Sequence, residues 1–237
     1  MLLDETVSAN NTDQNIKPVS SKKISESLQI GYANAVEAIC SSVQTETASE
    51  KSILLNRIVE GFMQVEGFNS EFYKKMAKSI QDSGDVNSQC DGGRIFGKGV
   101  TPLIAAHSVE LTELLLSHPD TDVNKGDPVG NSPLMRETRS GGEKFHILLA
   151  HPKTNINHVN SRGETALMWA KNTGNEEMLF TLLADQRVNL SIANQGNWVY
   201  TNTDWGIRNK VGEIMRSRGV DPEHVENLHI PILGRLT

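Results

Sequence analysis

The side chains of this 237-residue chain best suited to acid–base or metal chemistry are seven histidines and two cysteines. No two histidines stand four residues apart around an acid, the spacing with which one helix presents a pair of zinc ligands. Cys40 and Cys90 are too few for a disulfide framework or a four-thiolate metal site, and we expect both to be reduced thiols. Cys40 follows Ile39 on the apolar side of a predicted helix, which favours a small buried hydrophobic residue over a nucleophile. We therefore expect no catalytic residue, no metal ligand and no cofactor.

Two glycine pairs, Gly92-Gly93 and Gly141-Gly142, are next to be considered as phosphate-binding loops. Neither pair has the preceding strand, the following helix and the Lys-Ser or Lys-Thr dipeptide of such a loop. We interpret both as turns. No two carboxylates are spaced so that they would flank one substrate, and the sequence shows no site for a small-molecule substrate.

A repeated motif organises the centre of the chain. Thr101-Pro102-Leu103 recurs as Ser132-Pro133-Leu134 and then as Thr165-Ala166-Leu167. The pair His118-Pro119 recurs as His151-Pro152 after 33 residues. Threonine can cap a helix, proline fits its first position, and the leucines that follow form the buried stripe of a second helix. Two independent landmarks thus define a helical repeat of about 33 residues.

A period of about 33 residues that opens on Thr-Pro-Leu resembles the ankyrin repeat. The resemblance covers residues 84–222 and implies about four units, each a helix-turn-helix with a short β-hairpin loop. Val123-Asn124 and Ile156-Asn157 end successive units, and Val86-Asn87 ends a degenerate first unit in the same way. We therefore expect an all-α fold, an ankyrin-repeat solenoid preceded by an α-helical N-terminal region.

The chain outside the regular repeats divides into three parts. Residues 1–21 are polar and without periodicity, which predicts a disordered tail. Residues 22–83 predict three helices, and the last of them, over 71–81, is interpreted as the second helix of a degenerate capping repeat. The two preceding helices either complete that cap or form a small domain packed on it. Residues 223–237 contain proline and glycine and predict an irregular tail.

The last unit departs from the repeat pattern. Gly196 is placed in register with Gly163, and Trp198-Val199-Tyr200 replaces the Thr-Pro-Leu triplet. The helix that follows, over 208–218, has apolar residues for an inner side and basic residues elsewhere. Because the terminal unit of a solenoid needs a polar outer face, we interpret this unit as the C-terminal cap.

The second unit places a carboxylate where the family has a small alanine. Glu137 stands between Arg136 and Arg139, and burial of a lone carboxylate is costly. One interpretation is a recognition or catalytic carboxylate near these arginines. The other, which we favour, is a locally shifted helix in which Glu137 is salt-bridged and solvated.

The two histidines at equivalent places in the repeats have a structural interpretation. His118 and His151 each stand just before a proline at a predicted helix end. We interpret both as C-terminal helix residues that the helix dipole favours.

Composition excludes several classes of partner. The net charge of −6 argues against nucleic acid, whose binding needs a basic surface. No apolar run approaches the roughly 18 residues of a membrane span. The N-terminal residues include acids where a secretory signal has a basic region. We expect a cytoplasmic protein or, alternatively, one secreted into a host cell by a route without a cleaved signal peptide.

The resemblance implies that a partner protein docks on hairpin tips and first helices along a concave face. Tryptophan, tyrosine and arginine dominate binding hot spots, so the favoured patch joins an aromatic cluster to two arginines. Alternatively, Trp198 and Tyr200 plug the end of the stack. The predicted partner-binding residues are Asn131, Arg136, Arg139, Arg162, Glu164, Met168, Trp169, Asn197, Trp198 and Tyr200.

These features predict a protein–protein interaction module, a non-catalytic adaptor or scaffold whose partner is another protein. A second hypothesis is a bacterial effector that acts in a host cell, whose layout this chain resembles. In that case the repeats recognise the target and residues 22–96 carry a separate activity. A third is a structural scaffold that homodimerises through the N-terminal helices.

Overall fold

The computed structural model describes residues 47–222 except 68, 94–96, 141 and 193–194. Both predicted tails, the first predicted N-terminal helix and Cys40 lie outside the described residues. The described chain is all-α, and its helices are α2 (Ala48–Met63), α3 (Ser70–Ser83), α5 (Pro102–Ala105), α6 (Val109–Ser117), α7 (Pro133–Ser140), α8 (Glu143–Ala150), α9 (Ala166–Asn172), α10 (Glu176–Ala184), α11 (Gln195–Asn202) and α12 (Trp205–Ser217).

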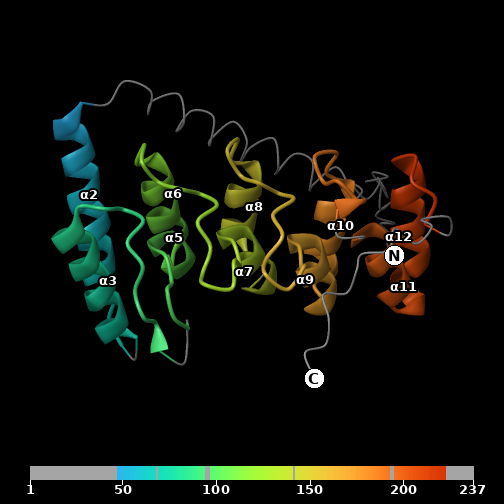
Figure 1. Cartoon of the computed structure of the whole chain (residues 1–237), viewed down its shortest axis with the longest axis horizontal. Coiled ribbons are helices and arrows are strands. Elements are labelled where there is room, and N and C mark those ends of the chain that lie inside the picture. The colour runs from blue at the N-terminus through green and yellow to red at the C-terminus, as the bar shows by residue number, and fades with distance from the viewer. Residues whose placement is uncertain (1–46, 68, 94–96, 141, 193–194, 223–237) are drawn as a thin grey trace, which may run out of the picture.

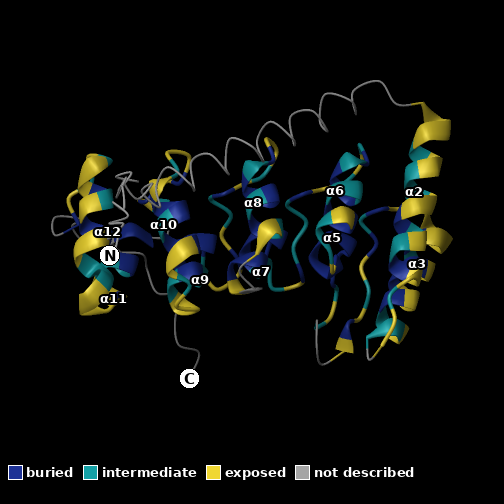
Figure 2. Cartoon of the chain, turned by 180° about the vertical axis from the view of Figure 1, so that it is seen from behind, coloured by how far each residue is buried: buried dark blue, intermediate teal, exposed yellow. Residues whose placement is uncertain are grey.

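The helices stack in pairs along the long axis of the molecule (Figure 1). α5, α7, α9 and α11, each the first helix of a unit, pack against their neighbours in one layer, which we call the first-helix layer. α6, α8, α10 and α12 make up the second-helix layer. The buried residues face the interior of the stack, and the exposed ones lie on the outer sides of the helices (Figure 2).

The repeat motif itself supplies the helix starts. Thr101 Oγ1 accepts a hydrogen bond from the Ile104 N–H, and Pro102 fills the first helical position of α5. Thr165 Oγ1 accepts from the Met168 N–H in the same way at the start of α9. These caps satisfy N–H groups that a helix cannot pair internally, which confirms the predicted helix starts.

Leucines at repeat spacing fill the core. Leu115, Leu148 and Leu182 stand in three successive second helices and are each at most 1% exposed. Burial of one such side chain contributes about 1.5 to 3 kcal/mol. The core is therefore continuous along the stack, because each unit buries its apolar side against the next.

An asparagine ladder joins consecutive units along their exit loops. Asn124 Nδ2 donates to the Lys153 carbonyl, and its Oδ1 accepts from the Asn155 N–H, both at 2.7 Å. Asn87 and Asn157 make the same pair of bonds to the loops that follow α6 and α10. The exit predicted for the degenerate first unit is thus joined to the next unit by the same rung as the exits of the later units.

The boundary between the third and fourth units has no ladder asparagine among the described residues. Ser191 takes its position: the Ser191 N–H donates to Asn189 Oδ1, just as the Asn157 N–H donates to Asn155 Oδ1 one unit earlier. Arg218, which caps α12, reaches back across this boundary instead. Its Nη1 donates to the Leu183 carbonyl at 2.8 Å, and its Nη2 donates to the Val188 carbonyl.

The first helix of the fourth unit begins earlier than predicted. α11 starts at Gln195, so Trp198–Tyr200 lies in the middle of the helix and not at its first turn. The assumed equivalence of Gly163 and Gly196 is wrong. Gly163 has φ +76° in a turn, whereas Gly196 lies inside α11 with its N–H on the Leu190 carbonyl at 2.9 Å. The preceding loop is shorter than in the other units, which moves the helix forward.

α2 and α3 form the N-terminal end of the described stack. The predicted helix over 71–81 is observed as α3, and Tyr73 packs edge-on against the His107 ring at 5.2 Å. Contact with α6 is made by α2, however, so α2 takes the place next to the second-helix layer that the sequence assigned to α3. Gly61 permits the close approach of α2 to α6, because a Cβ at this position would lie only 2.9 Å from Leu111 Cδ1.

Candidate functional site

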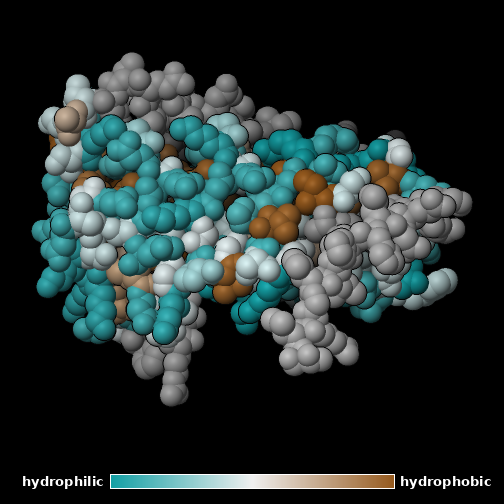
Figure 3. Space-filling model, in the orientation of Figure 1, coloured by the Kyte–Doolittle hydropathy of each residue, from teal (hydrophilic) through white to brown (hydrophobic). Residues whose placement is uncertain are grey.

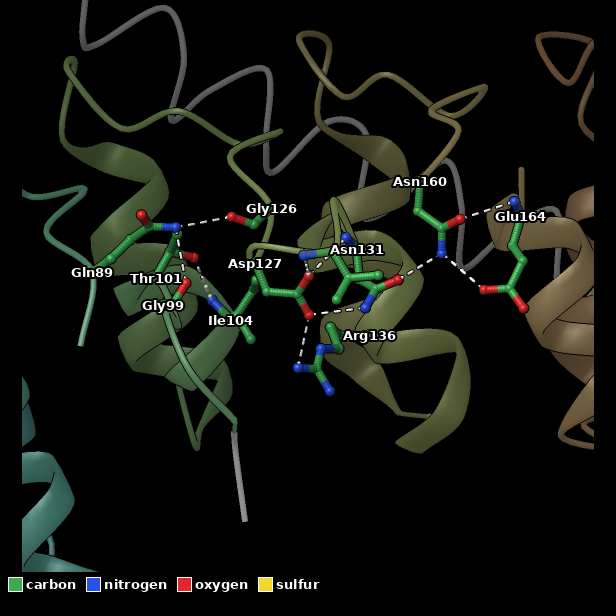
Figure 4. A network of polar contacts seen from close by, with 11 residues as sticks. Gln89, Gly99, Thr101, Ile104, Gly126, Asp127, Asn131, Arg136, Asn160 and Glu164 are labelled. Atoms are coloured by element: carbon green, nitrogen blue, oxygen red, sulfur yellow. Dashed lines mark hydrogen bonds and ion pairs between the residues drawn. The ribbon is translucent and has the colours of Figure 1, made fainter. Parts of the chain in front are cut away.

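A chain of polar contacts, which we call the hairpin network, runs along the loops that open the second and third units (Figure 4). Arg136 Nη2 lies 2.9 Å from Asp127 Oδ2, and Asn131 Nδ2 donates to the same oxygen at 2.8 Å. Asn160 Nδ2 donates to Asn131 Oδ1 and to Glu164 Oε2, at 2.8 Å each. The network therefore ties two units together through side chains that are largely buried.

Trp169 extends the hairpin network onto α9. Its Nε1 donates to Glu164 Oε2 at 3.1 Å. Trp169 stands one repeat length after Arg136, so equivalent positions of α7 and α9 each donate to a carboxylate of their own loop. Four predicted partner-binding residues are thereby brought into one network, namely Asn131, Arg136, Glu164 and Trp169.

The predicted site residues differ widely in exposure. Arg139 and Arg162 are exposed, while the half-buried members are Arg136, Glu164, Trp169, Trp198 and Tyr200. Asn131 and Met168 are each 7% exposed. Side chains buried this deeply pack inside the scaffold and offer almost no surface to a partner. Both residues are therefore assigned to the scaffold and not to the direct partner contact that was predicted from the sequence. Asn197 lies in α11, and its side chain is outside the described residues.

Two cation–π contacts place the aromatic residues of the last unit. Lys171 Nζ lies 5.3 Å from the centroid of the Trp198 ring, and the Arg208 guanidinium carbon lies 5.9 Å from that of Tyr200. Trp198 and Tyr200 pack against the core at the C-terminal end of the stack and keep part of their surface exposed. This packing agrees with the interpretation that they plug the end of the stack, and the exposed part of each ring leaves the predicted partner contact open.

Trp205 is a further tryptophan that the sequence offers for the binding surface of the fourth unit. It opens α12 and is 78% exposed, more than any other large hydrophobic residue in the described part of the chain. Its exposure depends on how α11 and α12 are joined, which no local pattern shows.

Glu137 is held by a lysine of the next helix. Its Oε1 lies 2.7 Å from Lys144 Nζ, which also donates to the Ala106 carbonyl at 2.7 Å. The predicted salt bridge is confirmed, but Glu137 is 6% exposed, so the predicted solvation is wrong. Lys144 reaches it from the first turn of α8, and this pairing makes burial of the carboxylate tolerable.

We expect Glu137→Gln to lower the free energy of unfolding by about 1 kcal/mol, because Lys144 keeps an acceptor but loses its counter-charge. Urea denaturation measures this loss. Glu213→Gln on the exposed side of α12 is the control and should change stability by less than about 0.5 kcal/mol. An equal effect of both substitutions would show that the buried pair does not contribute.

The repeated histidines are hydrogen-bond acceptors at helix ends. His151 caps α8, and its Nδ1 accepts the Lys153 N–H at 3.3 Å; His118 does the same for Asp120 after α6. Burial lowers the pKa of His151 to about 4. The predicted position is confirmed. The predicted dipole argument is wrong for His151, because a ring with this pKa carries no charge at neutral pH.

The described residues contain no group of three or more histidine, cysteine or acidic side chains that could hold a metal ion. No helix described in the structure has the length and the apolar character needed to cross a membrane.

The stacked helix pairs define a helical-repeat protein. Residues 162–195 match the family model of the ankyrin repeat. The matched stretch spans the third unit, with α9 and α10 and the loops on either side. The chain therefore contains an ankyrin repeat over residues 162–195, within an array of paired helices that is consistent with ankyrin-type helix-turn-helix units. Such a repeat suggests a protein-binding module and is typically non-catalytic. A comparison with curated proteins gave no match.

Proposed function

We propose that this chain is a non-catalytic adaptor or scaffold that binds a partner protein through its recognition face. This face comprises the loops before α7 and α9 and the exposed sides of α7, α9 and α11. The hairpin network carries the proposal, because it fixes Trp169 and Arg136 in place before any partner arrives. Preorganised side chains lose little conformational entropy on binding.

The distribution of side chains supports binding on this face. Arg139 and Arg162 are exposed, and the rings of Trp169 and Trp198 are half-buried. Arginine and tryptophan are the residue types that contribute most at interfaces. Hydrophilic side chains cover most of the surface in Figure 3, and hydrophobic ones appear in small separate groups. A surface of this kind favours a polar interface with a few apolar anchors.

The recognition face can be tested with a photo-crosslinking amino acid placed at one of two positions in the third unit. Asn172 is exposed at the end of α9, and Glu177 is exposed on α10 in the other layer. In lysate, we expect a discrete crosslinked protein with the reporter at Asn172 and at least about tenfold less with the reporter at Glu177, because a partner on this face covers the first site and not the second. Mass spectrometry identifies the product.

The two reporters share one repeat and one background, so unfolding would affect both. Crosslinking to the same protein with equal yield at both positions would contradict a one-sided recognition face. Absence of any discrete product at Asn172 would contradict the adaptor proposal itself.

A further inference from the structure

The first helices of the central units are basic, whereas the second helices α6 and α10 are acidic and α8 contains one acid and one lysine. α7 and α9 contain three cations, Arg136, Arg139 and Lys171, and one acid, Glu137, which is buried and paired with Lys144. α6 and α10 contain the glutamates Glu110, Glu113, Glu176 and Glu177 and no lysine or arginine. A chain with net charge −6 therefore places positive charge on the recognition face.

Three of the cations on this face have no carboxylate partner among the described residues. Arg139, Arg162 and Lys171 form no ion pair there, whereas Arg136 is paired with Asp127. Glu164 is the acid closest in sequence to Arg162, and its carboxylate already accepts bonds from Asn160 and Trp169. Within the described part of the chain, no carboxylate neutralises the positive charge of the three cations.

The cations are spread along and across α9. Thr173 Oγ1 donates to the Thr138 carbonyl at 3.4 Å, which joins the C-terminal ends of α7 and α9. Arg139 follows Thr138 directly, so it lies at the same end as Lys171. Arg162 precedes α9, whose seven residues are about 10 Å long. This separation suits several acidic side chains of one extended or helical segment, and is wide for a single carboxylate.

Aromatic surface accompanies the charge. Trp169 lies between Arg162 and Lys171 in the chain, and Lys171 leans over the ring of Trp198. Trp205 is exposed where α12 begins, directly after the turn that follows α11. A ligand that complements these side chains therefore needs apolar groups beside its acidic ones.

We propose that the recognition face binds an acidic segment of the partner protein, in which Asp or Glu side chains meet Arg139, Arg162 and Lys171 and an apolar side chain meets the exposed tryptophan surface. This inference rests on the proposed function and specifies its partner class. The glutamates of α6 and α10 disfavour binding of such a segment to those two helices, because like charges repel each other.

The probe for the test is a random peptide library displayed on phage and selected on the full chain. We expect enriched peptides to be strongly acidic and to contain aromatic or aliphatic residues. Their affinity should fall as salt is raised, because exposed charges are screened. Arg139→Gln with Lys171→Gln should weaken binding by about tenfold, as expected for the loss of two surface ion pairs. The single substitution Trp205→Ala should weaken it as well.

A matched control removes the same charge elsewhere. Arg57→Gln with Lys153→Gln replaces two exposed cations of α2 and of a loop, outside the recognition face, and should leave affinity within about twofold. Thermal unfolding of both double variants verifies folding. Equal weakening by both would mean that net charge and not the face attracts the peptides.

Three other results would overturn the inference. These are neutral or basic enriched peptides, no enrichment at all, and tighter binding of a labelled single-stranded oligonucleotide than of any selected peptide. If the Asn172 reporter still captures a discrete protein, the proposed function stands and the acidic partner class alone fails. Loss of that capture as well would remove both.

Discussion

Acidification from pH 7 to pH 5 should lower the free energy of unfolding by about 2 kcal/mol through His151 alone. Burial holds the pKa of this histidine at about 4 in the folded chain, against an ordinary value of 6.5. Above pH 6.5 the ring is neutral in both states and nothing is lost. Between pH 6.5 and 4 the unfolded chain binds the proton first, so stability falls as pH falls. The full loss, about 3 kcal/mol, is reached below pH 4.

His151→Asn isolates this contribution. In the third unit Asp185 stands at the equivalent helix end, and its Oδ1 accepts the Arg187 N–H at 2.9 Å. An asparagine oxygen can accept the Lys153 N–H in the same way and does not titrate. Urea denaturation of wild type and variant should therefore give a stability difference that shifts by about 2 kcal/mol in favour of the variant from pH 7 to pH 5.

The difference between the two proteins is the measured quantity, because other groups also titrate. Burial lowers the pKa of His107 and His146 as well, and both contribute in the same direction to the curve of each protein. A stability difference that stays constant across this pH range would contradict a buried neutral His151.

Removal of one rung of the asparagine ladder is the second large effect expected. Asn124→Ala deletes the donor to the Lys153 carbonyl and the acceptor for the Asn155 N–H. Each such bond contributes about 1 kcal/mol net, so we expect a loss of about 2 kcal/mol in the free energy of unfolding, measured by urea denaturation. The loss falls on the boundary between the first and second regular units. A repeat array unfolds by parts when such a boundary weakens, so the transition should also broaden.

Asn172→Ala is the matched control. Asn172 is also exposed near a unit boundary, at the end of α9, and the structure gives its side chain no hydrogen bond to the described residues. Its replacement should alter stability by less than about 0.5 kcal/mol. If both alanine variants unfold alike, the ladder contributes no stability to the stack.

Much of the fold could be predicted because its determinants are local and periodic. Thr101 and Thr165 cap helices through hydrogen bonds within a few residues, so residue type and spacing suffice to locate them. Val86-Asn87 could be matched to the next two exits because each of these three exit loops presents its asparagine to the following unit. The asparagines Asn87, Asn124 and Asn157 could have suggested the ladder, since each ends a unit and the last two are one repeat length apart.

The candidate site could be predicted in part. Arg136, Glu164 and Trp169 were chosen by type and position, and their bonds lie within their own units. The bond from Asn160 to Asn131 joins the loops of two units, which are brought together by the stack alone. The predicted register of the fourth unit was wrong because the loop between α10 and α11 is short. Every later residue therefore lies at a different position of its helix than predicted. A shift of this kind leaves no mark in composition, and it moved Trp198–Tyr200 from the start of a helix to its middle.

The sequence by itself determined the repeat and its length, the capped helix starts, the buried leucines and the class of protein, all of which follow from contacts between near neighbours in the chain. Only the tertiary structure decided that Glu137 pairs with Lys144, that Asn131 and Met168 are buried, and that Trp205 is exposed at the end of the stack. The physical reason is that burial and ion pairing depend on the distance between side chains of different units, which the packing of one unit on the next sets.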